Sequence, residues 1–233
     1  MNKIKLESNI INDNYTEYVC QKYDLQYTDK HVTEIPNFDK NELNEFKWNI
    51  GIICGNSGSG KSTILNTLGE PIKPSYDYDK PIISQFPNMS ENEVTNLFCS
   101  VGLSSVPIWL HKPNELSNGE QARLELAWII ANSNDKEIIL YDEFTSVINR
   151  HSAKSMSYAL QRYVREKNLK IILASCHFDI IEWLNPDWVF NLNKQNEGKC
   201  EIERFIYNDD EEYTLYNNIN EKDILTNEFN LKL

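Results

Sequence analysis

Short continuous runs of apolar residues recur along the chain, and longer stretches with apolar positions at helical spacing separate them. The runs at 48–54 (WNIGIIC), 137–141 (EIILY) and 170–176 (KIILASC) have the length and composition of strands that are buried on both faces. Residues 90–103 and 152–167 show the helical spacing. Strands that alternate with helices predict an α/β fold with a mostly parallel central sheet.

The remaining segments complete the predicted architecture. Residues 80–86 (KPIISQF) are predicted to form a further strand, and residues 187–207 to form two strands around a polar turn. Before Trp48, short β-like runs at 17–20 (EYVC) and 31–35 (HVTEI) alternate with polar breaks. This alternation predicts a small antiparallel layer at the N-terminus that packs against the core.

Composition favours one packed domain. The chain has 233 residues, of which 40% are hydrophobic and 11% aromatic, which is enough for one large core. We expect this domain over residues 1–207, with a short helical subdomain at about 86–130 and an acidic tail over 208–233. The five cysteines are scattered without a CxxC pair, which argues against a disulfide framework or a zinc knuckle.

Charge and hydropathy limit the kinds of partner and the cellular compartment that we expect. The net charge of −12 disfavours non-specific binding to a nucleic-acid backbone, so there is no strong direct nucleic-acid signal. No apolar run is long enough for a transmembrane helix, and the N-terminus lacks the apolar core of a signal peptide. We therefore expect a cytoplasmic protein without membrane insertion. The Asn-, Lys- and Ile-rich composition is typical of an AT-rich genome, viral or bacterial, and a viral origin would place the protein in the host cytoplasm.

Residues 55–63 (GNSGSGKST) match the phosphate-binding pattern G-x-x-x-x-G-K-[ST], with a predicted strand before them and a helix after them. In such a loop the backbone N–H groups face the phosphates, Lys61 reaches the β and γ phosphates, and Ser62 offers a hydroxyl to Mg²⁺. A Gly/Ser-rich turn without function is the alternative, but it does not explain the strand, the loop and the helix together. The predicted ATP contacts of this loop are Gly55, Asn56, Ser57, Gly58, Ser59, Gly60, Lys61, Ser62 and Thr63.

Two acidic residues, Asp142 and Glu143, follow the apolar run at 137–141. An acid at the C-terminal end of a parallel strand beside a phosphate loop is suited to hold Mg²⁺, which predicts Asp142 as a metal residue. The adjacent Glu143 is predicted to be the general base that orients the attacking water. Without the phosphate loop, an exposed pair of acids at a strand end would be the simpler interpretation.

Gln85 and His177 are polar residues at the ends of two other predicted strands. His177 is predicted to reach the γ phosphate, because its strand is expected to lie beside the strand that precedes Asp142. Gln85 is predicted to contact both Mg²⁺ and the attacking water. Either residue taken alone would more simply be structural or exposed to solvent.

Residues 116–120 (LSNGE) lead directly into an apolar helix-like stretch, and alone they would be an ordinary helix start with Ser117 as N-cap. The order in which this segment and the other motifs occur along the chain indicates a functional role. Together with the phosphate loop, Gln85, EIILYDE (137–143), TSVIN (145–149) and SCH (175–177), the chain resembles the ABC-type ATPases over about residues 15–207.

The resemblance implies a P-loop NTPase sandwich of ABC type, with ATP and Mg²⁺ as ligands and two chains paired head to tail. It implies that LSNGE is the signature motif, in which Ser117 and Gly119 bind the γ phosphate held by the other chain. It further implies that His177 is the switch histidine, Gln85 the Q-loop residue, and 146–149 the D-loop. Tyr27, with Tyr23 as the alternative, has the spacing of the aromatic residue that stacks on adenine.

Four residues depart from the usual family pattern. They are Asn118 and Glu120 in the signature, Phe144 after the catalytic Glu, and Asn149 in the D-loop. These departures argue against ordinary transporter coupling more than against ATP binding. The segments at 142–150 and 175–190 resemble the subgroup of ABC-type ATPases that is fused to, or partnered with, an acetyltransferase domain.

Two functions from different classes remain open at this stage. The first is a non-transport ATPase whose ATP-dependent homodimer drives an unidentified protein partner, nucleic-acid-related or acetyltransferase-like. The alternative is the nucleotide-binding subunit of a membrane transporter. The short stretch at 86–115, where transporter subunits resemble one another in having a longer helical subdomain, favours the first. A P-loop kinase would leave LSNGE and SCH unexplained.

Overall fold

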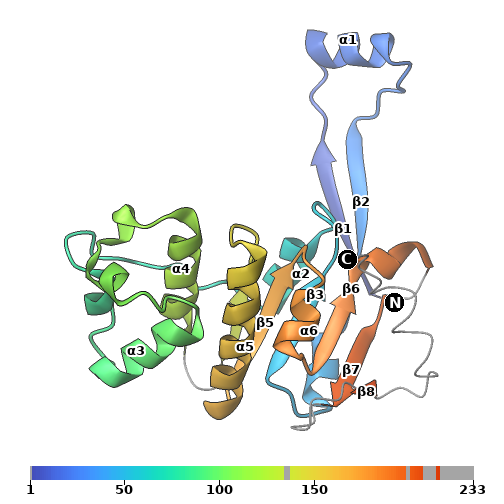
Figure 1. The fold of residues 1–233 in the computed structure, drawn as a ribbon. Coiled ribbons are helices and arrows are strands. Elements are labelled where there is room, and N and C mark those ends of the chain that lie inside the picture. The colour runs from blue at the N-terminus through green and yellow to red at the C-terminus, as the bar shows by residue number, and fades with distance from the viewer. Residues whose placement is uncertain (1, 134–136, 198–199, 207–213, 216–233) are drawn as a thin grey trace.

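The central sheet lies in the middle of the molecule (Figure 1). The computed structural model describes residues 2–133, 137–197, 200–206 and 214–215. The sheet is formed by six strands in the order β4-β5-β3-β6-β7-β8. Their bounds are β3 (Ile50–Cys54), β4 (Ile138–Tyr141), β5 (Lys170–Ser175), β6 (Trp188–Asn191), β7 (Ile202–Ile206) and β8 (Thr214–Leu215).

The first four strands in this order are parallel, and β7 and β8 add to the edge in antiparallel pairs. The α/β fold with a mostly parallel sheet is therefore confirmed. The prediction of two strands within 187–207 is also confirmed, because β6 and β7 form that antiparallel pair.

Alternate residues of each central strand face opposite sides of the sheet, as strand geometry requires. On β3, Ile50 and Ile52 join a core with α3 (Glu91–Ser100), α4 (Asn118–Asn132), α5 (Arg150–Glu166) and α6 (Ile180–Leu184). Ile53 joins a second core, on the other face, with α2 (Lys61–Leu68). Both faces are covered, which explains why the central strands read as continuous apolar runs.

Residues 80–86 do not form the predicted strand. Ile82–Gln85 is a short 3-10 helix, and Pro81 directly precedes it. Proline lacks the N–H that a ladder needs. The buried Ile82 instead donates its backbone N–H to the His111 carbonyl oxygen at 2.8 Å. Burial without a partner strand explains why the apolar run resembled a strand.

The N-terminal segment forms the predicted antiparallel sheet, but this sheet is a projecting arm rather than a packed layer. It consists of β1 (Asn2–Asn9) and β2 (Lys30–Asn37), and α1 (Asn14–Lys22) lies at its far end, away from the rest of the molecule (Figure 1). The run 17–20, predicted to be β-like, lies in α1. Asp13 starts that helix through a capping box with Thr16, whose N–H donates to the Asp13 carboxylate at 2.9 Å.

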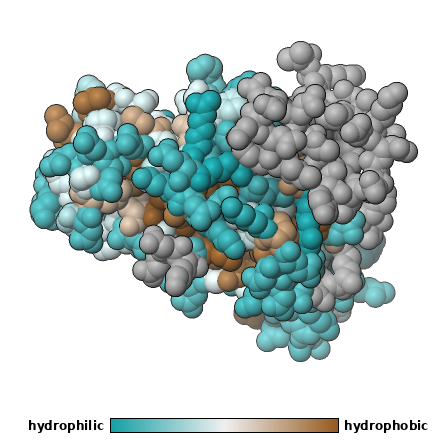
Figure 2. All heavy atoms as spheres, turned by 90° about the horizontal axis from the view of Figure 1, so that it is seen from below, coloured by the Kyte–Doolittle hydropathy of each residue, from teal (hydrophilic) through white to brown (hydrophobic). Residues whose placement is uncertain are grey.

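The arm leaves many apolar side chains in contact with solvent, and α1 has no buried residue. The exposed large apolar residues of this arm are Leu6, Ile11, Tyr15, Tyr18, Val19, Tyr23, Leu25, Tyr27 and Val32. The face of the molecule seen in Figure 2 is mainly hydrophilic, with apolar atoms near the middle of the view and at its left end. Among the described residues, no helix has both the length and the apolar character needed to cross a membrane.

Two of the predicted segments, 86–130 and 208–233, can be compared with the structure. The helical segment predicted at about 86–130 contains α3, most of α4 and two short 3-10 helices between them. The predicted acidic tail, 208–233, lies outside the described residues except for Thr214–Leu215, which pair with β7 as β8.

Candidate functional site

The phosphate-loop sequence forms a turn between the C-terminal end of β3 and the first residue of α2. Gly58 (φ +76°) and Gly60 (φ +97°) adopt the left-handed backbone that glycine favours. The side chain of Lys61 is buried, and its Nζ donates to the carbonyl oxygens of Gly55 at 3.0 Å and Asn56 at 2.9 Å. The ammonium group is thus held against its own loop, at the start of a helix whose N–H groups attract anions.

Two segments distant in sequence hold this loop in place. A Cβ atom at Gly60 would lie 2.6 Å from Cδ1 of Ile35, so β2 packs directly against the loop. On the other side, the Asn56 N–H donates to Asn193 Oδ1 at 3.0 Å, and Asn193 Nδ2 donates to Asn56 Oδ1 at 3.2 Å. Asn193 was not predicted to contact the loop, because it follows β6 in a polar stretch without any motif.

Two of the residues predicted to hold Mg²⁺, Ser62 and Asp142, lie at the same end of the parallel sheet. Ile64 and Leu65 of α2 share a core with Leu140 of β4, so α2 lies over β5 toward β4. Ser62 is exposed in the first turn of α2, and Asp142 directly follows β4. The C-terminal ends of β3 and β4 are separated by two strand spacings, roughly 10 Å.

A hydroxyl and a carboxylate are oxygen donors, and Mg²⁺ keeps several waters when it binds, so this pair fits the ion. Among the described residues no group of three or more His, Cys, Asp or Glu gathers as a metal site.

Asp142 and Glu143 lie in a strained turn after β4. Asp142 Oδ1 accepts the Glu143 N–H at 2.8 Å. Glu143 (φ +53°) and Thr145 (φ +67°) both have left-handed backbone, which is unfavourable for residues with a Cβ and most of all for a β-branched one. The Glu143 carboxylate is exposed and accepts a hydrogen bond from the Ser146 hydroxyl.

Phe144 anchors this turn to β5. Its side chain is fully buried, its N–H donates to the Ala174 carbonyl at 2.8 Å, and its carbonyl accepts the Ser175 hydroxyl at 2.8 Å. The departure from the family's proline at this position is thereby explained, since proline could not make the first of these bonds.

His177 lies beside the same turn. It follows β5, which pairs with β4 as the sequence predicted. Its Nδ1 is 3.5 Å from the Thr145 hydroxyl, and its backbone N–H donates to the Ser175 hydroxyl at 3.1 Å. Burial lowers the pKa of His177 below its ordinary value, and the nearby Arg150 guanidinium lowers it further, while Asp179 and Glu143 act in the opposite direction. The structure therefore brings together the turn at Glu143 and the imidazole.

None of the hydrogen bonds of Gln85 connects it to the turn at Glu143 or to His177. Its amide oxygen accepts the Asp77 N–H at 2.9 Å, and its amide nitrogen donates to the Asp77 carbonyl at 2.8 Å and to the Lys80 carbonyl at 3.2 Å. Gln85 holds the 77–81 turn in this state.

Ser117 caps α4 and is exposed. Its N–H and its hydroxyl both donate to Glu120 Oε2, at 2.9 Å and 2.7 Å, and the hydroxyl bond is the main reason why the pKa of Glu120 is lowered. A Cβ atom at Gly119 would lie 3.3 Å from the Val147 carbonyl oxygen, so the signature lies next to the predicted D-loop of the same chain.

Tyr27 lies at the far end of the projecting arm, where its hydroxyl donates to the Ile10 carbonyl at 3.1 Å. Lys30, where β2 begins, is roughly 17 Å along the strand from Ile35, the residue that contacts the phosphate loop. Tyr23 directly follows α1, at the same end of the arm. The structure does not bring either tyrosine next to the loop.

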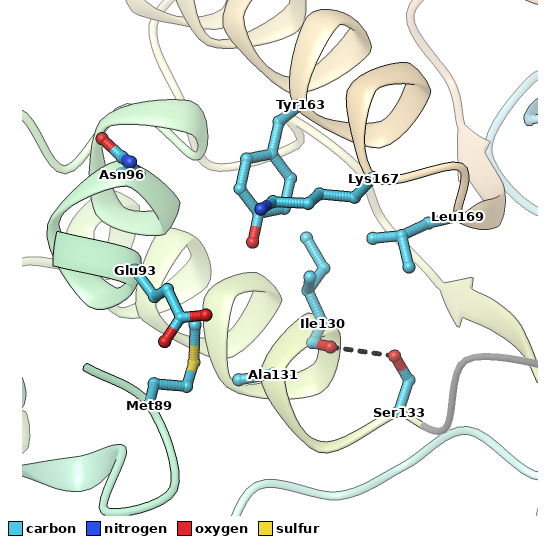
Figure 3. Close-up of a pocket in the computed structure, with 9 residues that line it drawn as sticks. All are labelled: Met89, Glu93, Asn96, Ile130, Ala131, Ser133, Tyr163, Lys167 and Leu169. Atoms are coloured by element: carbon cyan, nitrogen blue, oxygen red, sulfur yellow. Dashed lines mark hydrogen bonds between the residues drawn. The ribbon is translucent and has the colours of Figure 1, made fainter.

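Two pockets lie away from these residues. One, of about 250 Å³, lies between α3, α4 and the end of α5, and the Lys167 side chain extends there toward Tyr163 (Figure 3). Leu169, which lines it, directly precedes β5, so this pocket is at the end of the parallel strands opposite to the phosphate loop. The other is an apolar groove of about 350 Å³ on the arm, between α1 and the residues around Tyr27.

No family model matches the chain. The macrolide export ATP-binding/permease protein MacB of Shewanella sp. (strain ANA-3) is 31% identical over 168 residues, covering 52% of this chain and 25% of that protein. The thiamine import ATP-binding protein ThiQ of Histophilus somni (strain 129Pt) is 29% identical over 162 residues, covering 53% of this chain and 74% of that protein. The chain thus matches only about a quarter of the length of the MacB relatives.

Among solved structures, the dimeric ABC transporter cassette MJ0796 is similar, with a TM-score of 0.46 and 21% identity over 62% of this chain and 81% of that chain. The sequence similarity to proteins with ATP-binding cassettes has its physical counterpart in a phosphate loop that joins a parallel strand to a helix, beside an acidic turn and a histidine. The similarity to ATP-binding proteins and this arrangement both indicate an ATP-binding site in this chain.

Proposed function

We propose that this chain is an ATPase that binds ATP with Mg²⁺ and hydrolyses it between two copies paired head to tail. The observation that supports the proposal is that the Lys61 loop and the turn at Asp142 and Glu143 both follow C-terminal ends of parallel strands, at the same end of the sheet. Ligands of α/β proteins bind at this end of the strands.

Lys61 and the N-terminus of α2 would bind the β and γ phosphates, and the Lys61 ammonium would exchange its two carbonyl contacts for phosphate oxygens. Ser62 and Asp142, with Gln85 after release from the 77–81 turn, would hold Mg²⁺. The ion would neutralise charge that develops on the phosphates.

Glu143 is proposed as the general base, because its carboxylate is exposed and lies next to the metal residue. A positioned base of this kind contributes about 10² to 10⁴ in rate. His177 is proposed to donate a hydrogen bond to the γ phosphate from Nε2, while Nδ1 faces the Thr145 hydroxyl.

Ser117 and Gly119 are proposed to complete the site of the other copy. The N-terminus of α4 is exposed and carries the partial positive charge that attracts an anion. Residues 146–149 lie beside Gly119 and would line the same junction between the copies.

The work that the dimer drives is a separate question. The short helical segment between Gln85 and Leu116 supports a non-transport ATPase with an unidentified protein partner, nucleic-acid-related or acetyltransferase-like. The names of the relatives, which are export and import proteins, favour instead a nucleotide-binding subunit of a transporter. Recovery of the native protein with integral membrane proteins would decide for the second function, and recovery with a non-membrane partner for the first.

The ATPase proposal is tested by release of phosphate from ATP with purified protein, with and without Mg²⁺. We expect Mg²⁺-dependent turnover in the wild type. We expect Lys61→Ala to weaken ATP binding at least tenfold, because a buried charge facing the phosphates is removed. Lys47→Ala, outside the loop, is the matched control. Failure of the wild-type protein to bind ATP would overturn the proposal.

A further inference from the structure

We infer that Arg150 and Asp179 are positioning residues, whose ion pair fixes the Thr145 hydroxyl and, through it, the imidazole of His177 and the turn that carries Glu143. This inference rests on the proposed function for its kinetic consequence, but the arrangement of the side chains is independent of it. Both residues lie in segments that carry the resemblance, 142–150 and 175–190, but the sequence predicted no role for either of them.

The contacts of Arg150 span three separate segments. Its guanidinium binds both oxygens of the Asp179 carboxylate, from Nε at 2.9 Å and from Nη2. Its Nη1 donates to the Thr145 hydroxyl oxygen at 3.1 Å. The guanidinium also lies over the Trp183 ring, 5.0 Å from its centroid. A planar fork that is held on both oxygens and stacked on an aromatic ring has little freedom to move.

Thr145 is the residue that needs such support. It is a buried β-branched residue (2% exposed) with φ of +67°, a conformation that persists only where its surroundings impose it. The bond from Arg150 holds its side chain, and the turn from Glu143 to Thr145 includes a second left-handed residue. Loss of the guanidinium would therefore release the backbone that orients the Glu143 carboxylate.

The Thr145 hydroxyl also determines which nitrogen of the His177 imidazole carries the hydrogen. Because its oxygen accepts a hydrogen bond from Arg150, the hydroxyl is free to direct its own hydrogen to Nδ1 of His177, 3.5 Å away. This favours the neutral tautomer of His177 with hydrogen on Nε2, which leaves that nitrogen as a donor. A neutral donor at this position fits a group that contacts phosphate.

The charges that act on His177 come from three different segments. They are Arg150 at the start of α5, Asp179 directly before α6, and Glu143 in the turn after β4, with the Cys176 sulfur 3.9 Å from Nδ1. Burial is the first cause of the lowered pKa of His177 and Arg150 the second, whereas both carboxylates act to raise it. The ion pair thus balances one charge of each sign beside the imidazole.

A simple link between α5 and α6 is the alternative to a positioning role. Such a link would affect thermal stability and, through charge alone, the pKa of His177, but not the balance between its two neutral tautomers, which the ¹³C shifts of the imidazole also report. The test therefore follows the ¹³C-labelled imidazole of His177 by NMR between about pH 5 and pH 8 in nucleotide-free protein, around the ordinary histidine pKa. The variants are Arg150→Gln, Arg150→Lys and Asp179→Asn. Arg162→Gln removes the same charge from the exposed side of the same helix and is the matched control.

We expect the pKa of His177 to rise in Arg150→Gln, to fall in Asp179→Asn and to stay unchanged in Arg162→Gln. With Mg²⁺ and ATP, kcat should fall roughly tenfold or more in Arg150→Gln and Asp179→Asn, because misplaced catalytic groups lose rate steeply, while the Kd for ATP stays unchanged. Arg150→Lys keeps the charge but not the fork, so it should keep the His177 titration and lose kcat.

Titration of His177 identical to wild type in both Arg150→Gln and Asp179→Asn would overturn the inference, as would kcat values equal to that of Arg162→Gln. If the wild-type protein does not hydrolyse ATP, the proposed function fails, and the neutral tautomer of His177 still tests the positioning role: a smaller share of the form with hydrogen on Nε2 in Arg150→Gln supports it, and a share equal to wild type overturns it. Circular dichroism of each variant confirms that the comparison is between folded proteins.

Discussion

The side chain of Ile35 fills the space beside Gly60, so that a single methyl group added to Gly60 would overlap it at 2.6 Å. Through this contact the base of the projecting arm forms one wall of the phosphate loop. Because strand residues alternate, Thr33 and its partner Leu6 lie on the same face of the arm as Ile35, one step further from the loop.

A nucleotide held by the loop should therefore rest its base on this face rather than on Tyr27. Leu6 is 42% exposed there, about 7 Å along the strand from the contact with Gly60. We expect Leu6→Ser to weaken ATP binding roughly fivefold, since about 1 kcal/mol of apolar contact is lost. Calorimetry with ATP and with inorganic triphosphate separates the base from the phosphates. A larger loss of ATP affinity in Tyr27→Ser than in Leu6→Ser would contradict this placement.

Glu143→Gln should retain ATP binding and lose turnover by a factor of about 10² to 10⁴. The amide keeps the size of the side chain and its bond with Ser146 but cannot accept a proton from water. Single-turnover kinetics measure the chemical step, and equilibrium binding of ATP provides the control. Turnover within a few-fold of wild type would exclude Glu143 as the base.

Glu120→Gln should strengthen ATP-driven dimerisation. In the present state the Glu120 carboxylate occupies both the N–H and the hydroxyl of Ser117, which are the groups proposed for the γ phosphate. Removing a negative charge from that place lowers the repulsion against the phosphate. We expect a two- to tenfold gain in dimer affinity, which corresponds to about 0.4–1.4 kcal/mol. Light scattering at a series of ATP concentrations measures it. Weaker dimerisation in Glu120→Gln than in wild type would contradict the expectation.

The lowered pKa of His177 has a consequence for stability. The folded protein disfavours imidazolium, mainly through burial, so the unfolded chain binds the proton more readily below the ordinary value of 6.5. The free energy of unfolding should therefore decrease as the pH falls through this range, and it should decrease less in His177→Gln. Urea denaturation of both proteins at about pH 7.5 and pH 5.5 measures the difference. Equal decreases in the two proteins would show that His177 does not contribute.

The sequence predicted the central strands and the phosphate loop because burial on both faces and the glycine pattern leave local signals. Those signals failed where tertiary contacts decide the structure. The run 80–86 is apolar because Ile82 is buried, although Pro81 prevents a strand, and the run 17–20 became helical through the cap at Asp13. The role of Arg150 could not be predicted, because its partners Asp179 and Trp183 are about thirty residues away and nothing local in the sequence indicates that the three side chains meet.

The most direct measurement of the composite site is complementation between two inactive variants. Ser117→Arg should block closure of the signature on the γ phosphate, and Lys61→Ala should remove phosphate binding, so neither variant alone should hydrolyse ATP. In a mixed dimer, one site combines an intact Lys61 loop with an intact Ser117, and the mixture should recover a fraction of wild-type turnover. Lys61→Ala mixed with Glu143→Gln is the control without recovery, since both residues act from the same chain. Turnover of the first mixture no greater than that of the control would contradict hydrolysis between two copies of this chain.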